Sequence, residues 1–271
     1  MTSETSSRAP GQGGRRQARP VIVDLATVRL ARSAHAAHDA GIGVMEAVAS
    51  LANEPRTNHP ESASPVIAMF CRLINDRVGD QERQRLVAYV PRLVGTNASR
   101  DVELRRTTIV ADWAVRTVAV AALSAAGLRA EAERLSRLPH VTDVGSARGA
   151  ARAAATVHES VLRAAEAAAK VSRAAVRATW LSRTPDRSRE AEKAQGASIV
   201  LEAVRMSVAE AAQAAASVEA TWSESASTQV AAPTVVWAAV AAWAAAVHAA
   251  VQVPVAPIDW TAPLERMLAT S

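Results

Sequence analysis

Apolar residues recur at helical spacing along most of the 271-residue chain, and turn-forming residues separate the runs. The best-defined run begins at Ser64, a good N-cap, and Pro65, which suits the first helical position. Gly79 is expected to end this helix in the left-handed conformation, and Asp80 is expected to cap a second helix. Pro91 should kink or end that second helix. This stretch therefore predicts two buried helices joined by a short break.

Most of the remaining sequence also has helical periodicity. Further helices are predicted over residues 24–39, 44–54, 101–127, 128–138, 146–183, 186–223, 233–251 and 261–268. The two longest are rich in Ala, which has the highest helix propensity, and are broken at Pro185 and Asp186. They predict an antiparallel hairpin. The period-two runs typical of strands are missing from the sequence.

These patterns predict an all-α fold in which a compact N-terminal helical part packs against a long Ala-rich antiparallel helical bundle. We expect three regions: a disordered basic tail over residues 1–19, an N-terminal helical domain over 20–140 and the Ala-rich bundle over 141–271. Residues 233–251 are long and apolar enough to approach a membrane span. Because Ala contributes little to insertion and flanking basic residues are absent, a core helix is the preferred interpretation.

The distribution of charge gives little support for a nucleic-acid-binding surface on the helical part of the chain. The formal net charge is +5, but residues 1–20 carry Arg8, Arg15, Arg16 and Arg19 against Glu4, which gives 4 − 1 = +3 and leaves 5 − 3 = +2 for the rest. Nucleic-acid association is therefore predicted, at most, through this tail. No apolar run follows the basic residues as in a secretory signal, and a single cysteine fits a reducing cytoplasm. The predicted location is cytoplasmic, without membrane association.

Several motifs in the first half of the chain carry a family resemblance. They are His59-Pro60, Ser64-Pro65-Val66-Ile67, Asn75-Asp76, Arg83-Gln84 and Pro91-Arg92-Leu93-Val94-Gly95-Thr96. This set resembles a pattern in uncharacterised helical proteins of actinobacteria and their phages, over residues 41 to 140. The resemblance implies a source but no activity, so no functional residue follows from it.

Candidate chemistry is sparse and each candidate has a structural alternative. Asp112 and Arg116 stand four residues apart and are the only charged residues between Thr108 and Leu123, so they predict a buried pair that either fixes packing or marks a polar pocket. Arg77, Asp80 and Arg83 surround the break at Gly79, where an anion could bind or the turn is simply solvated.

Histidines give a weaker candidate. His35 and His38 share one predicted helical face, and His59 lies in a separate segment. A zinc site needs three or four ligands at close spacing, so a metal site at these residues is the less favoured interpretation. No cofactor is predicted.

No nucleophile, phosphate-loop or paired-carboxylate motif appears in the sequence. We therefore predict a non-enzymatic protein that acts through a protein partner or as a homo-oligomer. One alternative is a helical small-molecule or metal-dependent enzyme that uses Asp112, Arg116 and the histidines. The other is nucleic-acid association through the N-terminal tail. The five tryptophans of the second half are expected to serve mainly as core anchors.

Overall fold

The computed structural model describes residues 24–32, 41–182, 185–222, 228–252 and 258–270. Within these ranges the protein is helical and contains no strand, which confirms the all-α prediction. The elements are α1 (Val44–Leu51), α2 (Pro65–Arg77), α3 (Asp80–Gln84), η2 (Arg85–Tyr89), α4 (Val90–Leu93), α5 (Arg100–Trp113), η3 (Ala114–Ala119), α6 (Val120–Ala125), α7 (Arg129–Ser136), α8 (Val144–Ser182), α9 (Pro185–Trp222), α10 (Thr228–Gln252) and α11 (Thr261–Leu268). The predicted tail, His35 and His38 lie outside the described residues.

α2 begins as the sequence predicts. Ser64 is the N-cap, and its hydroxyl oxygen accepts a hydrogen bond from the Ile67 backbone N–H at 3.2 Å. Pro65 occupies the first helical position. The buried side of the helix includes Phe70 and Cys71, both 0% exposed, so the single cysteine is a core residue. Phe70 meets the Trp113 ring edge-on, with 5.8 Å between ring centroids.

Val78 and Gly79 separate α2 from α3, and the predicted left-handed helix end is wrong. Gly79 is extended, with φ −66° and ψ 166°, and it takes the N-cap position while Asp80 is already helical. The buried Arg83 side chain explains the difference, because its Nη2 donates to the Val78 carbonyl oxygen at 2.8 Å. A carbonyl satisfied by a side chain does not need the backbone donor that a left-handed residue supplies.

The second helix of this segment is divided into α3, the 3-10 segment η2 and α4. Pro91 is the second residue of α4, so the change of geometry precedes it in sequence. Because proline has no N–H to donate to the turn before it, a continuous α-helix across this point would leave a carbonyl unpaired. The predicted kink is therefore present, spread over a whole 3-10 turn.

Residues 24–32 do not form the helix predicted over 24–39. Asp24 starts a turn, and Leu30 then forms an isolated parallel bridge with Ile42. The Gln84 side chain fixes this bridge from α3: its Oε1 accepts from the Leu30 N–H at 3.0 Å, and its Nε2 donates to the Leu30 carbonyl at 2.9 Å. A long-range side-chain pairing thus outweighs local helix propensity here.

The long helix predicted up to Gly127 is present but not uniform. Ser99 is the N-cap of α5, and Gly127 closes the run with φ +75°. Between α5 and α6 lies a π segment, Ala114–Ala119, which the apolar spacing did not predict. A π turn holds one residue more than an α turn, so the buried face shifts in phase along this helix.

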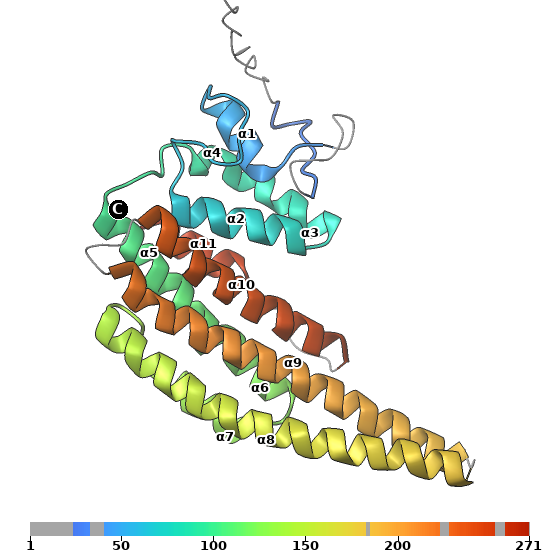
Figure 1. Ribbon diagram of the computed structural model, residues 1–271. Coiled ribbons are helices and arrows are strands. Elements are labelled where there is room, and N and C mark those ends of the chain that lie inside the picture. The colour runs from blue at the N-terminus through green and yellow to red at the C-terminus, as the bar shows by residue number, and fades with distance from the viewer. Residues whose placement is uncertain (1–23, 33–40, 183–184, 223–227, 253–257, 271) are drawn as a thin grey trace, which may run out of the picture.

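The second half of the chain contains the predicted hairpin of α8 and α9, which extends beyond the other helices (Figure 1). α10 packs against α9 on one side and against α2 and α5 on the other, so it joins the two parts of the molecule. Its middle is deeply buried, as expected of a core helix. Of the described helices, Arg100–Ala125 alone has the length and hydropathy of a membrane span, and 61% of that window is buried in the protein.

Gly41 provides a test of the bridge between Leu30 and Ile42. Its φ is +104°, and an added Cβ would lie 2.5 Å from the Arg29 carbonyl oxygen. Gly41→Ala is therefore expected to lower the free energy of unfolding by about 1–3 kcal/mol, measured by urea denaturation. Gly79→Ala is the matched control, since Gly79 has ordinary φ and open space around its Cα; an equal loss there would contradict the geometry described above.

Candidate functional site

Asp112 lies at the centre of a buried polar cluster. Asp112 is 3% exposed, and its Oδ1 accepts hydrogen bonds from the Val141 N–H at 3.0 Å and from Arg116 Nη1 at 3.5 Å. Its Oδ2 accepts from Arg266 Nη1 at 3.1 Å and lies 3.1 Å from His140 Nδ1. The predicted pair thus belongs to a larger group drawn from α5, η3, the loop after α7, and α11.

Hydrogen bonding decides the charge state of Asp112. Burial on its own would raise the pKa of this carboxyl, but hydrogen bonds from Val141, His140 and Arg266 outweigh burial and lower the pKa below its ordinary value. The carboxylate is therefore ionised, and its lone pairs already serve donors of the protein. An acceptor in this state ties elements together and is poorly suited to take a proton from a substrate.

A second buried ion pair lies on α5, between its N-terminus and Asp112. Glu103 and Arg106 are 3% and 4% exposed and are joined by a 2.7 Å contact. The Ser64 hydroxyl donates to Glu103 at 2.5 Å, so the cap of α2 is part of this pair. Arg106 also donates to the carbonyl oxygens of Met267 and Thr270, each at 3.2 Å. The C-terminal helix is therefore fastened to α5 at two separate points.

The residues around Gly79 do not form a free anion site. Arg83 is 2% exposed, and all three of its nitrogen atoms donate to protein acceptors: Nε to the Asn75 carbonyl, Nη1 to the Asp80 carboxylate and Nη2 to the Val78 carbonyl. Arg77 takes no part in this group. Because the guanidinium is buried and satisfied, Arg83 holds the turn together, which differs from both the anion site and the solvated turn considered above.

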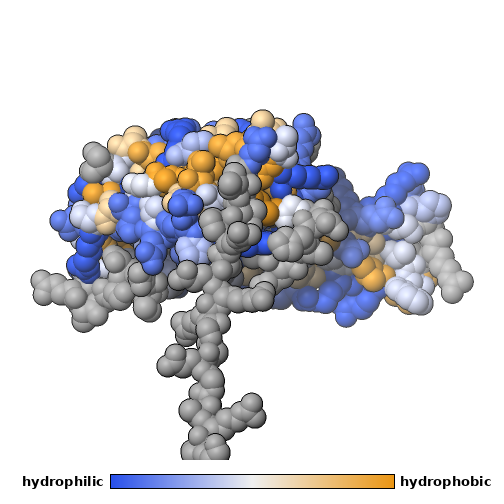
Figure 2. All heavy atoms as spheres, turned by 90° about the horizontal axis from the view of Figure 1, so that it is seen from above, coloured by the Kyte–Doolittle hydropathy of each residue, from blue (hydrophilic) through white to orange (hydrophobic). Residues whose placement is uncertain are grey.

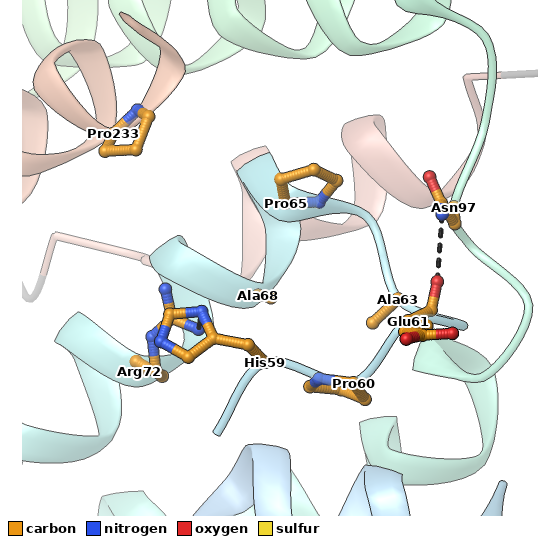
Figure 3. Close-up of a pocket in the computed structure, with 9 residues that line it drawn as sticks. All are labelled: His59, Pro60, Glu61, Ala63, Pro65, Ala68, Arg72, Asn97 and Pro233. Atoms are coloured by element: carbon orange, nitrogen blue, oxygen red, sulfur yellow. Dashed lines mark hydrogen bonds between the residues drawn. The ribbon is translucent and has the colours of Figure 1, made fainter. Parts of the chain in front are cut away.

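His59 lies at the edge of a pocket beside α2, with a volume of about 480 Å³ (Figure 3). The neighbouring Arg72 guanidinium, together with partial burial, lowers the pKa of His59. No group of three or more His, Cys, Asp or Glu side chains within the described ranges is arranged to hold a metal ion. Sequence reasoning did not bring His59 and Arg72 together, because their contact depends on how the loop folds back on α2.

The α8–α9 hairpin has two parts with different burial. In the inner part, the residues of α8 that face the core follow a heptad-like spacing: Ala147, Ala150, Ala154, Val157 and Val161. We define the outer hairpin as residues 166–181 and 185–199. Within it, Ala191 alone is buried. Many of the small residues that continue the seam are half-exposed, since only the end of α6, near Lys193 and Ala197, approaches the pair there.

The outer hairpin also exposes large apolar side chains. Near its end, Trp180 is 77% exposed and Leu181 is 89% exposed, and Val171 on the same helix is 61% exposed. Figure 2 shows the hairpin extending beyond the rest of the molecule, with apolar residues among hydrophilic ones on its outer part. The core-anchor interpretation is wrong for Trp180 and for the 49% exposed Trp237, whereas Trp243 and Trp260 are buried. Spacing alone did not distinguish these cases.

Comparison with models of known protein families, with curated proteins and with solved structures finds no match to this chain.

Removing the negative charge of Asp112 is expected to destabilise the fold. Asp112→Asn is expected to lower the free energy of unfolding at pH 7 by about 1–3 kcal/mol, because an amide accepts the hydrogen bonds of Arg266 and His140 more weakly than a carboxylate. Urea denaturation measures this change. Glu219→Gln, at the exposed pair with Arg148, is the control and should change stability little.

The same variant has an expected pH signature. The pKa of Asp112 is lowered by folding, so its contribution is complete well above the ordinary value of 3.8 and is lost as the pH falls through 3.8 towards the lower folded pKa. The stability difference between wild type and Asp112→Asn should therefore shrink on acidification through this window. A difference that stays constant or grows there would show that Asp112 is not held ionised by its partners.

Proposed function

We propose that this protein is a non-enzymatic helical interaction protein, and that the outer hairpin is the surface that binds its protein partner. The observation that carries this proposal is the exposure of Trp180 and Leu181 on a projecting part of the chain that buries almost nothing of its own.

Free energy supports a partner at this place. Burial of apolar side chains is the main favourable term in folding, and the outer hairpin gains little of it within the monomer. Its Ala content favours helix formation locally, so the two helices can persist without a core. A large aromatic and a leucine at the end of such an arm are then available for association, where tryptophan is among the residues that contribute most.

The shape of the arm indicates the kind of partner. The two antiparallel helices carry mainly small residues along their open seam, so another helix can approach them closely. We therefore expect a helical surface as the partner, either a second copy of this chain or another helical protein. With either partner, Trp180 and Leu181 would lie in the interface.

A photo-crosslinking experiment tests this proposal. A benzophenone amino acid placed at position 180 is expected to form a discrete covalent adduct in the cells that naturally make the protein, because that side chain would contact the partner. An adduct of twice the mass identifies a second copy, and any other mass identifies a different protein. The same amino acid at position 237, which replaces another exposed tryptophan on α10, should form no such adduct.

A side-chain variant supplies the second measurement. With the crosslinker moved to position 176, the double variant Trp180→Ala and Leu181→Ala should weaken capture by roughly 30-fold, which corresponds to a loss of about 2 kcal/mol at a binding hot spot. Thermal unfolding should be unchanged, since both side chains are exposed. Equal capture at positions 180 and 237, or no capture at either, would rule out the outer hairpin as the interaction surface.

A further inference from the structure

One side of α8 in the outer hairpin carries basic residues and no acid. Lys170, Arg173 and Arg177 are exposed and stand three and four residues apart, so they share one side of the helix. Residues 167–181 contain no Asp or Glu. We call these three residues the basic face.

The basic face points away from α9. The opposite side of α8 follows the same spacing and carries small, half-buried residues: Ala168, Ser172, Ala175 and Thr179. The Thr179 hydroxyl donates to the Arg187 carbonyl oxygen of α9 at 3.1 Å, so this side forms the seam between the two helices. The three cations therefore lie on the outward side of the hairpin.

No acid of the described chain compensates the basic face. Among the described residues, Lys170, Arg173 and Arg177 form no salt bridge and no side-chain hydrogen bond. The outer part of α9 differs, since it carries three acids and three bases: Asp186, Glu190, Glu192, Arg187, Arg189 and Lys193. A solvated helix surface commonly mixes both signs in this way, as α9 does. An acid-free face of α8 is instead complementary to an acidic surface on another molecule.

The basic face leads directly to the apolar end of the arm. Trp180 and Leu181 follow Arg177 by three and four residues, so they lie on the same side of α8. The two apolar side chains can supply contact energy, while the cations steer and orient the encounter. A helix that lies in a membrane surface needs a continuous apolar face along its length, and the charges at positions 170, 173 and 177 interrupt such a face.

From this arrangement we propose that the partner of the outer hairpin is a different protein that presents an acidic helical face. That face lies along Lys170, Arg173 and Arg177, and Trp180 and Leu181 pack at its end. A symmetric pair of copies of this chain would place the same patch on both sides of the interface and bring two basic faces together, which like-charge repulsion disfavours. This inference rests on the function proposed above and narrows its partner.

Charge reversal tests the inference on the full-length protein, with the benzophenone amino acid at position 180 in the cells that naturally make it. Lys170→Glu, Arg173→Glu and Arg177→Glu together should lower the adduct yield at least about tenfold, because complementary charge raises association rates by about 10- to 1,000-fold. The corresponding variant with Gln at the three positions should give an intermediate yield, and it keeps the test informative if the reversal frays the end of α8.

The matched control changes three exposed bases on α9 of the same arm: Arg187→Glu, Arg189→Glu and Lys193→Glu. It should retain most of the adduct. The partner segment crosslinked to position 180, identified by mass spectrometry, should contain more acids than bases. Thermal unfolding of the control and of the Gln variant should match that of the wild type, since all of these side chains are exposed.

The outcomes separate this inference from the proposed function. An adduct of twice the mass, a captured segment without an acidic excess, or a yield that falls equally in the control would overturn the acidic partner and leave the interaction surface in place. An adduct yield that ignores the charge of the basic face would do the same. Absence of any adduct at position 180 in the wild type would overturn both. Flotation of the protein with phosphatidylcholine–phosphatidylserine vesicles, abolished by the α8 reversal, would assign the face to a membrane and contradict the inference.

Discussion

The structure depends on satisfying the charges that α5 carries into the interior. A buried charge is tolerated only when it is paired and hydrogen-bonded, and α5 buries Glu103, Arg106 and Asp112. Their partners come from the cap of α2, the loop after α7 and the C-terminal helix. Each of these segments is therefore held at a defined place on α5. The same contacts hold the cap of α2, the loop after α7 and the C-terminal helix against α5.

Helix packing in the second half follows a different principle. α10 is apolar around most of its surface and is covered by α9, α2 and α5, so it supplies the core that joins the two parts of the molecule. α8 and α9 share that core only along their inner part. Towards its tip the hairpin consists of these two helices alone, and a pair of Ala-rich helices cannot enclose large side chains such as Trp180. Exposure of this arm is thus a geometric result of how far the hairpin extends past its neighbours.

The pocket beside α2 results from the same joining of the two parts. Its wall includes Pro233 of α10 and Arg72 of α2, and His59, Glu61 and Asn97 come from the loops before α2 and α5. Of the acids near Arg72, Glu46 pairs with Arg56, and Glu54 accepts from the backbone of residues 61 and 62. Asp76, one turn further along α2, interacts with Arg72 through its charge.

The sequence by itself determined the all-α class, the cap at Ser64 and the break between the two longest helices next to Pro185, because these follow from local propensity, proline geometry and apolar spacing. It did not determine the start of α10, which begins at Thr228 and contains Pro233. It also singled out Asp112 and Arg116. Only the tertiary structure decided that residues 24–32 pair with Ile42 instead of forming a helix, that Arg83 is buried, that His140 and Arg266 complete the Asp112 cluster, and that Trp180 is exposed while Trp260 is not. Each of these depends on contacts between residues distant in sequence, about which periodicity carries no information.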